Sequence, residues 1–308
     1  MFSLLISIII PTYNRSDMLE FTLPTIVELG KNNKELEIIL VDNNSSDNTK
    51  QVAARYIDQI RYEFVAKQGK NNALNKAIDV ALGEILVFID DDVTPDQKWL
   101  DEIIRSCEDW PEHDIFGGKV LPKFPIDTPD WVMHGEFAPF VFAIHDLPQN
   151  EGPYQDDATP SGPNCWIRKR LFDTGVRYDG NIGPKGTGRV SGSELEFFTR
   201  MKVQGVIPVY IPVAEVQHNI QNFQTTTKYL LKRSYASGMG YAYIYGFEGV
   251  NRIFGIPRYL FLQIVVNTLK GCWQFLINHK KRSMEFFMIV AHRCGCIKGS
   301  LNPPPIKK

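Results

Sequence analysis

Three consecutive carboxylates, Asp90, Asp91 and Asp92, end an apolar run in the stretch FIDDDV at residues 88–93. Like charges held this closely repel one another, and a bound cation relieves the repulsion. Hard carboxylate oxygens in a compact turn favour Mg²⁺ or Mn²⁺. Two carboxylates rarely saturate such an ion, and phosphate oxygens can take the remaining positions. The turn therefore predicts a divalent cation that holds a phosphorylated ligand, although alone it also fits an Asx-turn or a helix cap.

Two further polar clusters follow apolar runs. The segment PTYNR at 11–15 follows the run at 4–10, and Asp42 ends the run at 36–42. The carboxyl ends of parallel strands meet at one edge of a sheet, where ligands bind in open α/β folds. Three such clusters together favour a bound polar ligand over a cap. The sequence has no GxxxxGK[ST] loop and no GxGxxG after its first apolar run, so a Walker loop and a glycine-turn dinucleotide site are unsupported.

The elements that must position these residues alternate between strands and helices. Apolar, β-rich runs predict strands at 4–10, 36–42, 60–66 and 84–90, and helical patterns lie at about 16–30, 47–57, 71–82 and 95–108. This alternation predicts an α/β fold with a mostly parallel central sheet flanked by helices. Loops rich in Pro, Asp and Gly then occupy about 122–163, and a further helix is expected at 191–204.

Composition limits the possible partners and the compartment. The chain has 308 residues, of which 44% are hydrophobic, with 34 Lys or Arg against 35 Asp or Glu. This near-neutral balance gives no support for nucleic-acid binding. The five cysteines fit no disulfide framework, and we interpret them as reduced thiols. The apolar N-terminus lacks a basic flank and a cleavage site, so we expect a strand rather than a signal peptide and a cytoplasmic protein.

The last 80 residues differ from the rest. The runs at 259–269 and 271–278 are uncharged but separated by Lys270, and each is too short to span a membrane. The adjacent HKKR at 279–282 fits an interfacial amphipathic segment on a membrane surface. A helical pair packed on the core and a homo-oligomer contact remain open alternatives. We expect a domain at 1–225 and a C-terminal helical region at 226–308.

Together the segments SIIIPTYNR, ILVDNNSSDNT and GKNNALNKAIDVALGEILVFIDDDV resemble the inverting glycosyltransferases of family two. The resemblance covers about residues 5–220 and implies the GT-A fold, with a C-terminal helical extension here. It implies transfer of a sugar from a nucleoside diphosphate-sugar, with UDP favoured, to a hydroxyl group. The acceptor would be a glycan or a lipid-linked saccharide in cell-surface polysaccharide synthesis, and the cofactor Mn²⁺ or Mg²⁺.

The resemblance also implies roles for single residues. Asp42 would accept hydrogen bonds from the base, a plausible way to read a uracil-type edge, and Asp90 would contact the ribose or a metal-bound water. Asp92 would ligate the metal, with His218 as a further contact or a core histidine instead. The remaining residues expected at the nucleotide-sugar are Pro11, Thr12, Asn14, Arg15, Lys70, Asp91 and Asn164. For Lys70, a solvated lysine at a helix start is an equally open interpretation.

The segment GSELEFFTRMKVQG at 192–205 resembles the acceptor-site block of the family. An inverting transfer needs a carboxylate that takes the proton of the acceptor hydroxyl. Glu194 stands where the family usually has Asp, and Ser193 replaces the preceding Glu. We favour Glu194 as the base, with Glu196 as the second choice. Ser191 and Glu194 also match a capping box, which is compatible with the catalytic role.

Two other functions remain open on the sequence alone. A nucleotidyltransferase shares the α/β frame and the metal, but PTYNR replaces the glycine-rich loop expected after its first strand. A catalytically inactive nucleotide-sugar-binding protein would keep the pocket and lose the base, and the replacement at Ser193 keeps this alternative open.

Overall fold

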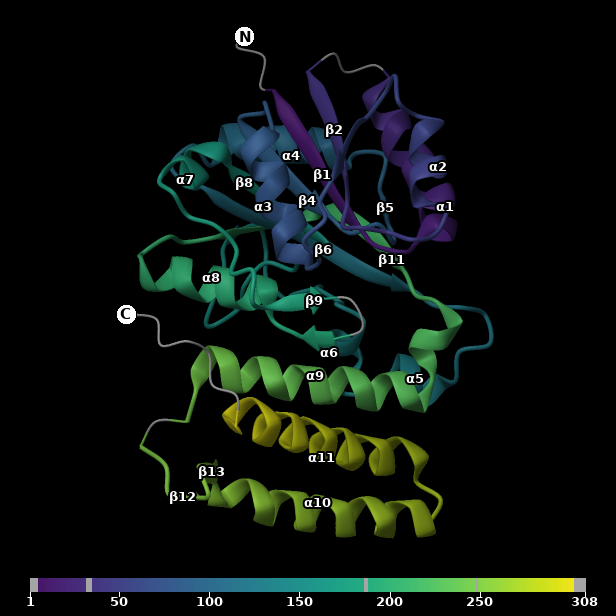
Figure 1. Cartoon of the computed structure of the whole chain (residues 1–308), viewed down its shortest axis with the longest axis vertical. Coiled ribbons are helices and arrows are strands. Elements are labelled where there is room, and N and C mark those ends of the chain that lie inside the picture. The colour runs from purple at the N-terminus through teal and green to yellow at the C-terminus, as the bar shows by residue number, and fades with distance from the viewer. Residues whose placement is uncertain (1–4, 32–34, 186–187, 248, 302–308) are drawn as a thin grey trace. The chain divides into compact units, whose positions relative to one another are not determined.

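The computed structural model describes residues 5–31, 35–185, 188–247 and 249–301 (Figure 1). The chain forms two compact units. Unit 1 comprises Met1–Lys123, Ala143–Asn181 and Ser193–Asn219, and unit 2 comprises Phe124–Phe142, Ile182–Gly192 and Ile220–Lys308. The helical region expected at 226–308 therefore belongs to a larger unit, which also takes in two segments from the middle of the chain.

Unit 1 is built on one sheet. Its strands are β1 (Ile6–Thr12), β2 (Leu36–Asp42), β3 (Arg61–Phe64), β4 (Ile85–Ile89), β5 (Val93–Pro95), β6 (Ile115–Lys123), β7 (Gly152–Pro153), β8 (Asn164–Arg168) and β11 (Val209–Asn219). The strand order is β3-β2-β1-β4-β8-β6-β11-β5, and β7 pairs with β11. The strands β3, β2, β1 and β4 are parallel, as are β6 and β11, whereas β8 runs antiparallel to both of its neighbours. The predicted α/β fold class is confirmed.

Helices cover both faces of this sheet. They are α1 (Ser16–Gly30), α2 (Thr49–Ala54), α3 (Lys70–Val80), α4 (Trp99–Asp109), α7 (Lys169–Asp173) and α8 (Ser193–Val203). Successive side chains of a strand point to opposite faces, so Ile8 packs in the core beneath α1, α2 and α4 and Ile9 in the core beneath α3, α7 and α8. Because both faces are covered, the strands carry the continuous apolar runs seen in the sequence.

The strands and helices expected before residue 95 agree with the structure, and the first difference lies at Pro95. The strand predicted at 36–42 has those bounds in β2, and the helix predicted at 16–30 has those bounds in α1. The helix predicted at 95–108 begins instead at Trp99, because 93–95 forms the edge strand β5 against β11. Proline is tolerated on an edge strand, where its missing N–H leaves no ladder bond unmade. That helix boundary was wrong for this reason.

Unit 2 is mainly helical. Its elements are α5 (Asp130–Met133), α6 (Ala138–Val141), β9 (Gly183–Lys185), β10 (Gly188–Val190), the 3₁₀ helix η1 (Asn222–Thr225), α9 (Thr227–Tyr245), β12 (Arg252–Ile253), β13 (Ile256–Pro257), α10 (Arg258–Leu276) and α11 (Lys280–Leu301). Figure 1 shows α9, α11 and α10 side by side, with α11 between the other two.

Most of the two runs expected at 259–269 and 271–278 forms one helix, α10. Gly271 is buried against the ring of Phe287, and the ammonium group of Lys270 lies 5.7 Å from the ring centre of Phe286, so neither residue interrupts the helix. Although α10 has 19 residues, no helix in the described part of the chain combines the length and the apolar character needed to cross a membrane.

Candidate functional site

The acidic turn follows β4 and lies beside the end of β1. The hydroxyl of Thr12 donates to Asp91 Oδ2 at 2.7 Å, and Arg15 Nη1 donates to Asp91 Oδ1 at 3.0 Å and to Asp92 Oδ2. From β11, His218 Nε2 lies 3.4 Å from Asp92 Oδ2. Asp91, Asp92 and His218 are all buried. The structure thus brings together the two residues expected at the metal, and it also shows that Arg15 partly neutralises the turn.

The loops after β1 and β2 are joined by Asn14. Its backbone has a φ of 50°, a left-handed conformation that Asn tolerates better than most residues. The Asn14 amide oxygen accepts from the backbone N–H of Ser46 at 2.7 Å, and Asn14 N donates to Ser45 Oγ at 2.9 Å. Asp42 in turn accepts from Ser45 N at 2.8 Å and from the Tyr62 hydroxyl at 2.6 Å. The three polar clusters lie at one sheet edge, as the strand order requires.

Lys70 joins the acidic turn to the candidate base. It is the first residue of α3, and its ammonium group donates to Asp90 Oδ1 at 2.6 Å and to Glu194 Oε1 at 2.8 Å. Burial lowers the pKa of Lys70, but the two carboxylates outweigh burial and raise this pKa above its ordinary value. Lys70 therefore stays protonated between two anions, and the alternative of a solvated lysine is wrong.

A small recess lies beside this ion pair. It has a volume of about 10 Å³, close to that of one water molecule, and Pro11, Lys70, Asp90, Gly162 and Glu194 are among its lining residues. A Cβ atom on Gly162 would lie 2.6 Å from the carboxyl carbon of Glu194. Gly162 thus leaves the space that the Glu194 carboxylate occupies. No pattern in the sequence predicted this role of Gly162.

Glu194 lies in the first turn of α8, and its neighbour Glu196 is engaged elsewhere. Both oxygens of Glu196 accept from Arg200 one turn later, at 3.0 and 3.2 Å, and the Glu196 side chain is 7% exposed. Ser191 lies two residues before the start of α8, whereas the N-cap of a capping box directly precedes the helix. The N–H of Ser191 donates to the Ala236 carbonyl at 3.2 Å, and α8 begins at Ser193. The geometry therefore favours Glu194 over Glu196.

Known proteins share this sequence pattern and this fold. The family model described as glycosyl transferase family 2 matches residues 7–175, which is more than half of the chain. The chain belongs to glycosyl transferase family 2. This assignment makes it a glycosyltransferase rather than a nucleotidyltransferase.

Individual relatives of this family 2 glycosyltransferase are distant. A glucosyl-dolichyl phosphate glucuronosyltransferase of Haloferax volcanii is 23% identical over 76% of this chain and 75% of the relative. A GalNAc(5)-diNAcBac-PP-undecaprenol beta-1,3-glucosyltransferase of Campylobacter jejuni is 35% identical over 38% of this chain and 39% of the relative. The solved mannosyltransferase PcManGT of Pyrobaculum calidifontis, in complex with GDP-Man and Mn²⁺, has a TM-score of 0.65 and 15% identity over 97% of this chain and 88% of its own. The GT-A fold predicted from the resemblance is confirmed.

Asn164 has a scaffold role in this glycosyltransferase, which corrects the expectation that it contacts the donor. Its side chain is fully buried. The amide oxygen accepts from Trp99 Nε1 at 2.9 Å, and the amide nitrogen donates to the carbonyls of Lys119 and Ala214 at 2.9 and 2.8 Å. Both amide protons are used and no surface is left for a ligand. Asn164 instead ties β8 to α4, β6 and β11.

Acidic side chains gather in the site of this family 2 enzyme. Asp90, Asp91, Asp92 and Glu194 are four carboxylates that share two permanently charged partners, Arg15 and Lys70. Burial raises the pKa of Asp91 above its ordinary value despite Arg15. Burial also acts to raise the pKa of Asp92, but His218 and Arg15 outweigh it and lower that pKa. A divalent cation would add positive charge that lowers the repulsion among these carboxylates.

The donor atoms of the turn also fit such an ion. Asp92 Oδ1 is buried and has no hydrogen-bond partner among the described residues, which is costly unless another group binds it. Within the same part of the chain, no three His, Cys, Asp or Glu side chains form a complete metal site. Asp92 and His218 would therefore be two protein ligands of an ion whose remaining positions are left for other donors.

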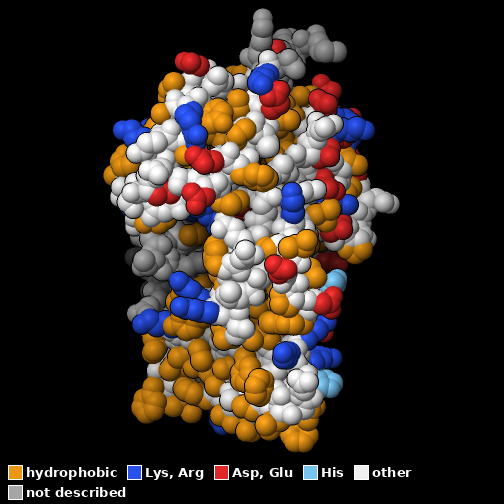
Figure 2. All heavy atoms as spheres, turned by 90° about the vertical axis from the view of Figure 1, so that its right-hand side faces the viewer, with side chains coloured by type: hydrophobic (Ala, Val, Ile, Leu, Met, Phe, Trp, Pro, Cys, Tyr) orange, Lys and Arg blue, Asp and Glu red, His pale blue; other side chains and the backbone are white. Residues whose placement is uncertain are grey.

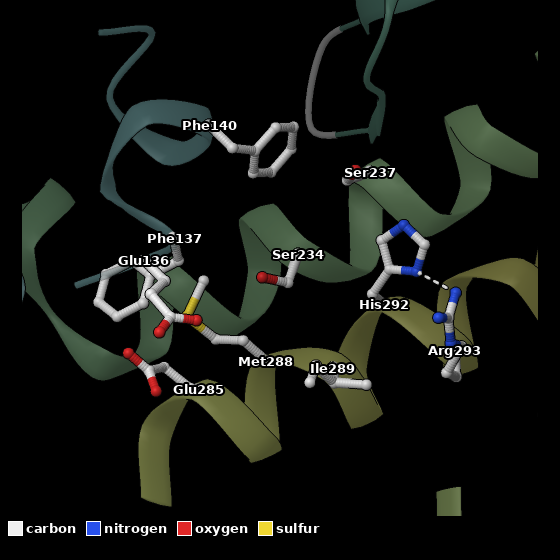
Figure 3. Close-up of a pocket in the computed structure, with 10 residues that line it drawn as sticks. All are labelled: Glu136, Phe137, Phe140, Ser234, Ser237, Glu285, Met288, Ile289, His292 and Arg293. Carbon is white, nitrogen blue, oxygen red and sulfur yellow. Dashed lines mark hydrogen bonds between the residues drawn. The ribbon is translucent and has the colours of Figure 1, made fainter. Parts of the chain in front are cut away.

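A larger cavity lies in unit 2 and contains none of the expected site residues. It has a volume of about 420 Å³, between α9, α11 and the segment before and within α6 (Figure 3). Phe137, Phe140 and Met288 line it together with Glu285, whose Oε1 has no hydrogen-bond partner among the described residues. The acidic turn and the candidate base both lie in unit 1, so this cavity is not the donor site that the sequence predicts.

Proposed function

We propose that this glycosyltransferase moves a sugar from a nucleoside diphosphate-sugar to an acceptor hydroxyl in one displacement with inversion. The observation that carries the proposal is the ion-pair bridge of Lys70, which holds Asp90 and Glu194 on either side of one ammonium group at 2.6 and 2.8 Å. The bridge keeps the candidate base beside the turn that is expected to hold the donor. An inverting transfer needs these two parts of a site next to each other.

Glu194 is the proposed base. The acceptor oxygen attacks the anomeric carbon from the face opposite the nucleotide, and Glu194 takes the hydroxyl proton. The new carbon–oxygen bond forms as the bond to the nucleoside diphosphate breaks, and the diphosphate leaves with the electron pair. Glu194 is fixed by Lys70 and given space by Gly162, so little reorganisation is needed before the proton moves.

The donor would lie along the edge formed by Pro11, Thr12, Asn14 and Arg15. Asp42 is the proposed reader of the base, with uridine favoured. Each carboxylate oxygen can accept more than one hydrogen bond, so the bonds from Ser45 and Tyr62 leave acceptor capacity on Asp42. The PcManGT structure contains GDP-Man, which supports a nucleoside diphosphate-sugar as the donor class and does not identify the base.

Asp92 and His218 are the proposed protein ligands of Mn²⁺ or Mg²⁺. When bound, such an ion supplies positive charge that stabilises the leaving diphosphate. Around that position Arg15 adds a permanent cation, and the hydroxyl of Thr12 orients Asp91. The Mn²⁺ in the PcManGT structure supports this choice of metal class.

The proposed acceptor is a glycan or a lipid-linked saccharide used to build cell-surface polysaccharide. The names of the two relatives include a dolichyl phosphate and an undecaprenyl diphosphate carrier, which supports this class. We place the enzyme in the cytoplasm, at the inner face of the membrane. The absence of disulfides among the cysteines, all of which lie in the described part of the chain, fits a reducing compartment.

Glu194→Gln tests the proposed base. The amide keeps the size of the side chain but cannot accept the proton, so kcat should fall by at least about 100-fold, the usual contribution of a general base. Release of nucleoside diphosphate in the presence of acceptor measures the rate. Glu196→Gln is the matched control and should stay within a few-fold of the wild type. Unchanged turnover of Glu194→Gln would remove Glu194 from the base role.

A further inference from the structure

The outward face of α10 is apolar, and its inward face is the more polar one. Leu262, Leu269 and Leu276 are 67%, 66% and 76% exposed, and exposed side chains on the same helix include Phe261, Leu262, Val265, Leu269, Trp273 and Leu276. On the other side, Gln263, Asn267 and Thr268 are half-buried. A helix on a protein surface in water normally has the opposite arrangement. The outward face of α10 is therefore suited to an apolar surrounding.

The hydrogen bonds of the inward face fit this reading. Asn267 Nδ2 donates to the Gln263 carbonyl at 2.7 Å, and Thr268 Oγ1 donates to the Ile264 carbonyl at 2.8 Å. From α11, Ser283 Oγ donates to the Gly271 carbonyl at 3.0 Å. Asn267, Thr268 and Ser283 thus bond to backbone carbonyls inside the helix pair, whereas the buried Gln263 Oε1 has no hydrogen-bond partner among the described residues.

The charged residues within α10 and directly next to it in the sequence all have one sign. Between Gly249 and Met284 the sequence has no Asp or Glu, but it has six Lys or Arg residues, and three of them follow the helix as Lys280, Lys281 and Arg282. In Figure 2, hydrophobic side chains dominate the lower part of the view, the level at which α10 lies in Figure 1. An apolar strip flanked by cations complements the boundary between acyl chains and anionic headgroups.

The aromatic residues of α10 stand near its two ends. Tyr259 is the second residue of the helix, and Trp273 lies in its last turn, where it is 61% exposed. Tyr and Trp favour the headgroup level of a bilayer, because their rings are apolar and their polar atoms can reach water. A second copy of the chain fits this surface less well, because a symmetric contact through α10 would place the cations of both copies near each other.

We propose that the outward face of α10 docks on the surface of an anionic lipid bilayer and holds the enzyme there without crossing it. The helix would lie in the interface, with Leu262, Val265 and Leu269 among the acyl chains and Lys280 and Lys281 at the headgroups. This surface is independent of the transfer chemistry proposed above. Its effect would be to keep the enzyme where lipid-linked acceptors are located.

Flotation of the full-length protein with vesicles tests this proposal without donor or acceptor. The vesicles contain phosphatidylcholine alone or with about 30% phosphatidylglycerol. We expect binding to the anionic vesicles that weakens at about 0.5 M salt, because the headgroup contribution is screened. The variant Leu262→Glu/Leu269→Glu should bind at least about tenfold more weakly, since it loses two leucine side chains that the proposal buries among the acyl chains of the bilayer.

Ile126→Glu is the matched control. Ile126 is 99% exposed in unit 2 but lies outside α10, so this variant should bind vesicles like the wild type. The proposal is overturned if the wild type does not bind anionic vesicles, or if the double variant binds them equally well. It is also overturned if light scattering shows that the wild type is a dimer and the double variant a monomer, while neither protein binds vesicles. Turnover with a water-soluble acceptor should be unchanged in the double variant, which separates this test from that of Glu194.

Discussion

At position 162, the absence of a side chain has a direct consequence for the proposed base. The backbone there is outside the left-handed region that favours glycine, so alanine can adopt it, but its Cβ would lie 2.6 Å from the Glu194 carboxyl carbon. The atoms that it meets belong to the end of a flexible side chain. We therefore infer that Gly162 is kept for the position of a carboxylate rather than for the backbone.

Gly162→Ala should lower kcat by roughly 10- to 100-fold while the melting temperature changes little, because the carboxylate moves and the core does not. Steady-state kinetics and thermal unfolding measure the two effects. If Gly162 acts through Glu194, adding Gly162→Ala to the Glu194→Gln variant should cost nothing further. An additional loss in the double variant would show that Gly162 has another role.

For Asn164 we expect a substitution to lower the stability of the fold rather than the rate of the reaction. Asn164→Ala would leave Trp99 Nε1 and two backbone carbonyls without their present partners in a buried region. Each buried group left unsatisfied costs about 1–3 kcal/mol, so the free energy of unfolding should fall by roughly 3 kcal/mol or more. Chemical denaturation measures this loss. A variant of normal stability with weakened donor binding would instead restore the ligand role that the resemblance implied.

At the scale of elements, the contact between α9 and α11 depends on two glycines. A Cβ on Gly295 would overlap the Tyr235 carbonyl oxygen and lie 3.0 Å from Met239 N, and a Cβ on Gly238 would overlap the His292 carbonyl oxygen. The obstacles are backbone atoms, which cannot move without shifting a helix. Small residues at these positions let the two helices approach closely, and this approach is part of how unit 2 is built.

Gly295→Ala should therefore destabilise unit 2. The helix propensity of alanine gains about 1 kcal/mol, but the overlap with backbone costs about 1–3 kcal/mol or more. Hydrogen exchange of the α9 and α11 amides should report the net loss. Gly30→Ala in α1 is the control, because its Cβ meets only side-chain carbons at 3.5 Å and should be neutral or stabilising. Equal effects of the two substitutions would contradict the close approach.

For the molecule as a whole, the negative charge of the acidic turn links stability to ligands. The neighbouring carboxylates of the turn repel one another, and a divalent cation bound between them and a diphosphate would lower this repulsion and bridge the two anionic groups. A ligand that binds only the folded state raises the melting temperature. The stabilising effect of UDP should therefore depend on the metal.

We expect Mn²⁺ with UDP to raise the melting temperature by several degrees, and EDTA to remove most of the rise together with turnover. In Asp92→Asn, the part of the rise in melting temperature that depends on Mn²⁺ should be lost, because the substitution removes the negative charge of a proposed metal ligand. Asp101→Asn, at an exposed carboxylate in the first turn of α4, is the control and should respond like the wild type. A metal-dependent rise that persists in Asp92→Asn would place the ion elsewhere.

The sequence by itself determined the alternation of strands and helices over about the first 90 residues, the gathering of PTYNR, Asp42 and the acidic turn at one sheet edge, and the resemblance to the family. These features follow from local periodicity and from the rule that parallel strands end on the same side. Only the tertiary structure decided that Lys70 pairs with Glu194, 124 residues away, that Gly162 makes room for it, and that Asn164 is sealed in the scaffold. It alone decided which face of α10 is outward. Contacts over such separations depend on how whole elements pack, and a pattern of neighbouring residues carries no direct record of that packing.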